Sequence, residues 1–109
     1  MSETTRENIA HEIIAALAET TRRLIVMTDA RDFVYLEDGV AFRIMPNATH
    51  AREVRITRLY NGRHRMEFGE IRNLEFHPRT VRHSVTTEGL REVFEQATEL
   101  YLSLGTMSH

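Results

Sequence analysis

Apolar residues recur at helical spacing near the start of the chain. Isoleucine and leucine follow one another at four-residue intervals among alanines, which predicts a helix from about Thr5 to Thr21. The apolar stripe continues into Leu24–Met27, but this short run favours β-structure and follows two β-branched threonines. We therefore expect a strand at Leu24–Met27.

A second apolar stripe lies at the end of the chain and runs from Leu90 to Leu104. Thr87 is a suitable N-cap residue for this helix, and Gly105 stands where a C-terminal glycine is typical. This stripe predicts a C-terminal helix over residues 88–104.

The middle of the chain contains two sequences typical of β-hairpins. Phe33–Leu36 and Val40–Ile44 flank Asp38-Gly39, and a two-residue loop there would place Tyr35 opposite Phe42 and Phe33 opposite Ile44.

The second hairpin centres on Asn61-Gly62, with arms from Glu53 to Tyr60 and from Arg63 to Phe68. A two-residue loop would pair Arg58 with Arg65 on one face of the sheet and Arg55 with Phe68 on the other.

Two further strands are predicted after the second hairpin. Ile71–Phe76 reads as one strand, Pro78 is expected to break it, and Val81–Val85 alternates as the last strand. The predicted fold class is therefore α+β, with an N-terminal helix, an antiparallel β-meander of about five or six strands and a C-terminal helix. Two arrangements stay open: both helices cover one face of the sheet and a second copy covers the other, or one helix covers each face.

Length and composition indicate one globular domain over residues 1–109, with residues 1–4 and 106–109 frayed. Hydrophobic residues make up 41% of the chain and charged residues 28%, which argues against disorder. The absence of cysteine excludes disulfides, thiolate zinc sites and cysteine nucleophiles. We expect a cytoplasmic protein, because the first residues are polar and no stretch is long and apolar enough to span a membrane.

Charge is segregated along the chain. Residues 1–42 carry four arginines and eight acids, residues 43–82 carry nine arginines and four acids, and residues 83–109 carry one arginine and four acids. The predicted helices are therefore acidic and the later β region is basic. All fourteen basic residues are arginine, either because of codon bias or because bidentate contacts to carboxylate or phosphate are selected.

The basic β region offers a candidate binding surface. It is made up of Arg55, Arg58, Tyr60, Arg63, Arg65, Arg79 and Arg82. Arginines around an aromatic residue suit a surface that follows phosphates and stacks a base. The same pattern also suits the solvated face of a sheet, self-association against the acidic helices, or docking of an acidic protein.

Histidine is the residue type with most catalytic promise. His64 follows the second hairpin turn, and His77 and His83 bracket Pro78. A metal site could use His77 and His83 with Glu75, but no dedicated ligand spacing occurs in the sequence. Phosphate-binding glycine loops and nucleophile motifs are absent. We therefore predict no catalytic, cofactor or metal site.

Three functions follow as hypotheses. The first is a non-enzymatic accessory or regulatory module that acts through charge-complementary protein contacts as a homodimer; its layout resembles, in architecture only, small bacterial or phage accessory proteins such as secretion chaperones and inhibitors. The second is a nucleic-acid-binding protein that uses the arginine-rich hairpin. The third is a small enzyme or ligand-binding fold that uses His64, His77 or His83.

Overall fold

The computed structural model describes residues 3–102, with side chains from residue 5 onward, and confirms the predicted α+β class. The predicted frayed residues 1–2 and 106–109, and Gly105, lie outside the described residues. In chain order the elements are α1 (Glu3–Ala18), α2 (Thr21–Thr28), β1 (Arg31–Leu36), β2 (Gly39–Arg43), β3 (Glu53–Arg58), β4 (His64–Arg72), β5 (Glu75–Val85), a 3₁₀ turn (Thr87–Gly89) and α3 (Leu90–Thr98).

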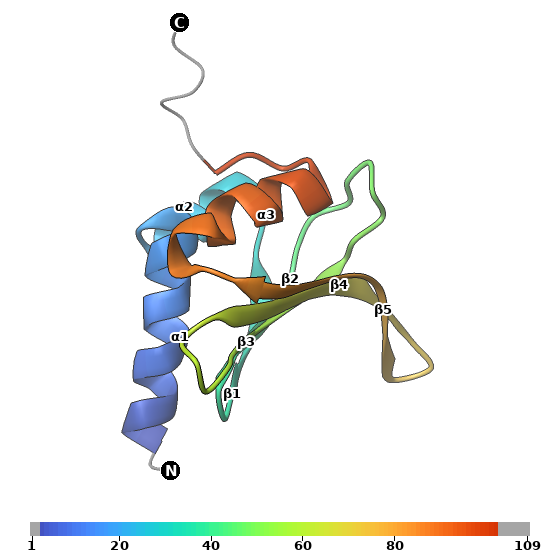
Figure 1. Ribbon diagram of the computed structural model, residues 1–109. Coiled ribbons are helices and arrows are strands. Elements are labelled where there is room, and N and C mark those ends of the chain that lie inside the picture. The colour runs from blue at the N-terminus through green and yellow to red at the C-terminus, as the bar shows by residue number, and fades with distance from the viewer. Residues whose placement is uncertain (1–2, 103–109) are drawn as a thin grey trace, which may run out of the picture.

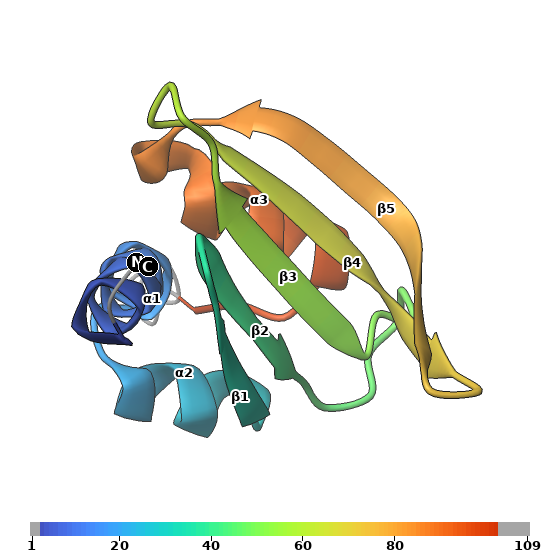
Figure 2. The same ribbon diagram turned by 90° about the horizontal axis from the view of Figure 1, so that it is seen from below.

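The five strands form one antiparallel sheet in the order β1-β2-β3-β4-β5. The helices gather on one side of it: α1 packs against β1 and β2, α2 packs on α1, and α3 packs against β4 and β5 (Figure 1). Seen from the opposite side, the strands stand in front and α3 lies behind them (Figure 2). Of the two predicted arrangements, the structure therefore shows the one in which both terminal helices cover the same face.

The prediction of one helix followed by a strand at Leu24–Met27 was wrong. The chain forms α1, a short break at Glu19 and Thr20, and then α2. The hydroxyl of Thr20 accepts a hydrogen bond from the backbone N–H of Arg23 at 3.0 Å and caps α2. Leu24 and Thr28, four residues apart, both lie buried on the inner side of this helix. Burial on one helical face therefore outweighs the β preference of the run.

The first hairpin forms, but its turn lies one residue earlier than predicted, so that Tyr35 pairs two residues away from the predicted Phe42. Leu36 pairs with Gly39 and Tyr35 pairs with Val40, so the turn residues are Glu37 and Asp38. Gly39 lies inside β2, where a Cβ would stand only 1.9 Å from the carbonyl oxygen of Ile56 on β3. The glycine therefore permits the close approach of two strands rather than the turn itself.

The second hairpin also forms in a different register. Its loop has three residues, Tyr60 to Gly62, and Gly62 adopts a φ of 84°. This is the hairpin in which the last loop residue is left-handed, a role that glycine fills at no steric cost. As a result, Arg58 pairs with His64 rather than with Arg65, and the predicted pairings were wrong.

The strands predicted after this hairpin were placed wrongly. Ile71–Phe76 is not one strand, because β4 ends at Arg72 and β5 begins at Glu75, and Pro78 does not break β5. β4 continues through Gly69, where its pairing with β5 is irregular. Pro78 is tolerated because β5 is an edge strand, where a missing N–H removes few ladder bonds. The strands are joined by Asn73 and Leu74, whose φ angles of 52° and 65° are both left-handed.

The C-terminal helix is shorter than predicted, and Thr87 is not its N-cap residue. Thr87 begins a 3₁₀ turn that Thr86 caps by accepting a hydrogen bond from the N–H of Gly89 at 3.2 Å, and Gly89 precedes α3. The helix ends at Thr98, before Glu99 in a left-handed conformation. Leu102 then folds back and is buried, with its N–H bonded to the Glu95 carboxylate at 2.7 Å, which explains why the apolar stripe outlasts the helix.

The hydrophobic core lies between the helices and the sheet. Its centre is Phe94 of α3, whose ring lies 6.4 Å from that of Phe42 on β2 and 6.3 Å from that of Phe68 on β4. Leu17 of α1 and Leu24 of α2 are also fully buried in it. No helix among residues 3–102 is long and apolar enough to cross a membrane.

Candidate protein-interaction face

The side of the sheet away from the helices, here called the open face, carries every second residue of the strands. Its rows follow from the strand register, and no helix among residues 3–102 lies over it (Figure 2). The side chains on it are Val34, Ala41, Arg43, Glu53, Arg55, Thr57, Arg65, Glu67, Ile71, Phe76, Pro78 and Val81. Arginine and apolar side chains are therefore interleaved across the whole face.

A glutamate at the centre of the open face organises its arginines. Glu53 lies 3.0 Å from Arg55 and 3.7 Å from Arg43, measured between carboxylate oxygens and guanidinium nitrogens. The Glu53 side chain is 10% exposed, whereas those of Arg43 and Arg55 are 46% and 37% exposed. The carboxylate thus lies beneath two arginines, which present their positive charge to an approaching molecule.

Apolar side chains on the same face are left without cover. Val34 is 54% exposed and Leu74, at the β4–β5 turn, is 98% exposed. Phe76 is half-buried, with its ring 4.3 Å from the guanidinium carbon of Arg55. An aromatic ring stacked by arginine, beside exposed aliphatic groups, is typical of the composition of protein interfaces.

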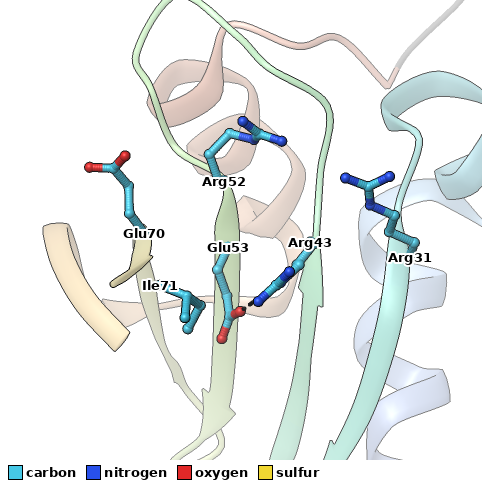
Figure 3. Close-up of a pocket in the computed structure, with 6 residues that line it drawn as sticks. All are labelled: Arg31, Arg43, Arg52, Glu53, Glu70 and Ile71. Atoms are coloured by element: carbon cyan, nitrogen blue, oxygen red, sulfur yellow. Dashed lines mark ion pairs between the residues drawn. The ribbon is translucent and has the colours of Figure 1, made fainter. Parts of the chain in front are cut away.

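The sheet curves over its open side: the β4–β5 hairpin bends away from α3, and the β1–β2 hairpin runs downward beside α1 (Figure 1). A hollow of about 420 Å³ lies on this concave surface and is lined by Asp32, Val34, Arg43, Glu53, Arg55, Ile71 and Leu74. A second hollow of about 220 Å³ adjoins it and is lined by Arg31, Arg43, Arg52, Glu53, Glu70 and Ile71 (Figure 3). Because they share three residues, we treat them as one groove, here called the sheet groove.

The structure separates the predicted binding residues. Arg55 and Arg65 lie on the open face, whereas Arg58 lies on the helix side and pairs with Glu12 of α1 at 2.8 Å. Tyr60 is fully exposed in the β3–β4 loop, and Arg63 beside it donates to the carbonyl oxygen of Ser84 at 3.1 Å.

On the edge strand β5, Arg79 lies 3.6 Å from Glu70. Arg82 stands opposite Met66, in a row whose other members face the core, and donates to the carbonyl oxygen of Val81. The seven predicted residues are therefore spread over both sides of the sheet and one hairpin loop.

The three candidate histidines are also separated. His64 is fully buried, with Nδ1 3.3 Å from the carbonyl oxygen of Val85, while His77 and His83 lie on β5. Burial lowers the pKa of His64 below its ordinary value of 6.5; the hydrogen bond with Val85 raises it in part, and Arg58 lowers it. His77 lies 4.0 Å from Glu75, but no group of three His, Asp or Glu side chains within residues 3–102 is placed to hold a metal ion.

Of the residues that line the sheet groove, only Arg55 was predicted from the sequence as a binding residue, and those that were missed include Arg31, Arg52 and Leu74. Arg31 and Arg52 stand at strand starts far apart in the chain, and only the strand register brings them to one hollow. Leu74 follows Asn73 in the order of a type I′ turn, a position where glycine is usual. The dipeptide Asn73-Leu74, with leucine where the turn favours glycine, is the one signal in the sequence that indicated Leu74.

Comparison of the chain with protein-family models, with curated proteins and with solved structures finds no match.

Proposed function

We propose that this protein is a small non-enzymatic accessory or regulatory module of the cytoplasm that docks a partner protein on its open face. One observation carries the proposal: a concave sheet face, free of helices among the described residues, on which exposed apolar side chains alternate with arginines. Antiparallel sheets tolerate solvent on one side, but that side then usually carries polar residues. Val34, Leu74 and Phe76 depart from this rule in the way that interfaces do.

The placement of the arginines favours a protein partner over a nucleic acid. Arg58, Arg79 and the pair around Glu53 each stand beside a carboxylate, which offsets their charge toward phosphates. A surface that follows a phosphate backbone needs a run of unpaired positive charge. Nucleic-acid binding through Arg58, Tyr60, Arg63 and Arg65 therefore stays the alternative, and the experiment below includes it.

The predicted homodimer is a second way to cover the open face. A two-fold dimer through this face would bring the same patch of each copy together. We keep it as a prediction of oligomeric state, to be read from the mass of the cross-linked product.

The test is photo-cross-linking from defined positions. A benzoylphenylalanine side chain is introduced at Val34 or Thr57 on the open face, and at the exposed Gln96 of α3 as the matched control. Each variant is irradiated in the cells that normally produce the protein, and the products are separated by mass. We expect a discrete protein adduct from the two open-face positions and none from position 96.

Each product has one meaning. A protein adduct confined to the open face supports the proposal, and an adduct of twice the chain mass supports the homodimer. An adduct that nuclease removes moves the assignment to nucleic acid, and equal yields from Val34 and Gln96 overturn the proposal.

A further inference from the structure

Two arginines of the sheet groove stand without a carboxylate. Among the described residues 3–102, the guanidinium group of Arg31 forms no hydrogen bond or ion pair, and that of Arg52 donates only to the carbonyl oxygen of Ile44 at 3.4 Å. Both groups line the same hollow, whereas the guanidinium of Arg43 turns toward Glu53 (Figure 3). Arginine forms its strongest contacts with planar carboxylates, in a two-bond geometry, so this end of the groove suits one.

The other end of the groove presents an exposed leucine held in an unfavourable backbone conformation. Leu74 has a φ of 65° and is 98% exposed. An L-residue with a Cβ is unfavourable in this region, and glycine would remove the cost. Since Leu74 gains no burial among the described residues in return, its side chain suits a contact outside the chain.

Resting on the proposed function, we propose that the sheet groove binds an extended acidic segment of a partner protein. A carboxylate of the segment sits between Arg31 and Arg52, and an apolar side chain of the segment packs on Leu74 and Val34. The molecule measures 44 × 33 × 24 Å, and an extended segment of about ten residues spans a distance of roughly 33 Å. A segment of that length reaches across the sheet.

The sheet groove suits an acidic segment better than it suits a second copy of the chain or a nucleic acid. A second copy of the chain, related by a two-fold axis through the groove, would bring the same arginine-containing patch of each copy together, with Arg43 and Arg55 exposed on both. A nucleic acid carries a phosphate at every step of its backbone and would place charge against the apolar Ile71 and Leu74 as well as against the arginines. An acidic and apolar segment meets complementary groups at both ends.

The probe is a display library of random peptides of about ten residues, selected on the immobilised full chain. We expect selected peptides to combine Asp or Glu with Leu, Ile or Phe. The best peptide, labelled with a fluorophore, is then titrated against three proteins and followed by anisotropy. The proteins are the wild type, Arg31→Ala/Arg52→Ala, and the control Arg22→Ala/Arg82→Ala, which loses the same two charges outside the groove.

We expect the groove variant to bind the peptide at least about tenfold more weakly, and the control to stay within about twofold of the wild type. Leu74→Gly, which relieves backbone strain, is expected to weaken binding while the far-ultraviolet spectrum stays unchanged. A single-stranded oligonucleotide is titrated in parallel, and sedimentation velocity reports the oligomeric state.

Several outcomes overturn the inference. They are selection of basic peptides, equal weakening by the two double variants, tighter binding of the oligonucleotide, or a dimer that dissociates in the groove variant. Absence of any selected peptide overturns it as well, provided that an unrelated immobilised protein selects its known peptide. Cross-links from Val34 combined with any of these results leave the docking function standing and remove only the acidic segment.

Discussion

The two sides of the sheet are built from alternate residues of the same strands, yet one side is buried under the helices and the other is open. On the helix side, Val40, Ile56 and Met66 form one row across three strands and are fully buried. One residue along, Ala41, Arg55 and Glu67 form the neighbouring row on the open face. The comparison teaches that stability is concentrated on the side that the helices cover, and that the other side is free to carry recognition.

The largest expected effect comes from breaking the covered side. Phe94→Ala removes a fully buried ring that contacts Phe42 and Phe68, and we expect it to lower the free energy of unfolding by about 4 kcal/mol. Phe76→Ala, on the open face, is the matched substitution and should cost about 1 kcal/mol, because its ring is only half-buried. Urea unfolding of both variants checks the comparison. Equal losses would mean that the open face is as structural as the core.

A smaller effect is expected from the acid beneath the open face. Glu53→Gln leaves Arg43 and Arg55 without their shared carboxylate, and we expect a loss of about 1–2 kcal/mol of unfolding free energy. The same variant should bind acidic peptides more tightly, because Arg43 and Arg55 no longer pair with the carboxylate of residue 53. The control is Glu67→Gln, whose carboxylate lies 4.0 Å from Arg65; it should change stability by less than about 0.5 kcal/mol. Unchanged peptide affinity in Glu53→Gln would contradict the claim that Glu53 offsets the positive charge of Arg43 and Arg55 on this face.

Leu74→Gly sharpens the comparison in the opposite direction. Because the leucine is fully exposed and left-handed, glycine should raise the free energy of unfolding by about 1 kcal/mol. Asn73→Gly in the same turn should change it much less, since asparagine tolerates this conformation. Thermal unfolding of the two variants decides the point, and destabilisation by Leu74→Gly would show that the leucine stabilises the fold.

The most gradual effect concerns the buried histidine of the covered side. Burial lowers the pKa of His64 in the folded chain. As the pH falls below about 6.5, the unfolded chain therefore binds a proton at this histidine more readily than the folded chain does. The free energy of unfolding should therefore fall as the pH drops below this value, and His64→Leu should remove that part of the slope. The measurement is the urea midpoint at several pH values, with the exposed His83→Leu as the control. An unchanged slope in His64→Leu would contradict the assignment.

The covered side of the fold was predictable because each part has a local signal. The turn dipeptides located both hairpins, and the apolar stripes located the terminal helices. The errors occur where the structure depends on contacts between distant parts of the chain. Gly39 lies in β2 and allows the close approach of β3, instead of forming the turn. The β-favouring run at Leu24–Met27 is helical because Leu24 and Thr28 are buried on one face of the helix. Pro78 breaks a strand only if the strand is central, and the sequence does not state which strand lies at the edge.

The open face was less accessible to sequence reasoning. A one-residue difference in hairpin register moves a side chain to the other face, and it sent Arg58 to Glu12 while Arg65 stayed on the open side. Arg31 and Arg52 carry no local pattern, and they lie at one hollow only because β1, β2 and β3 are adjacent.

The irregular outer strands, β1 and β5, affect how readily the sheet pairs edge to edge with other chains in a concentrated solution. β1 is irregular between Arg31 and Val34, where Asp32 adopts a left-handed φ of 57°, and β5 carries Pro78, which has no N–H to offer a new strand. Both borders of the sheet are therefore interrupted, which makes them poorer templates for a strand of another molecule. A chain that displays Leu74 and Val34 to solvent is in this way protected from stacking edge to edge, and the approach left to another molecule is from above the strands.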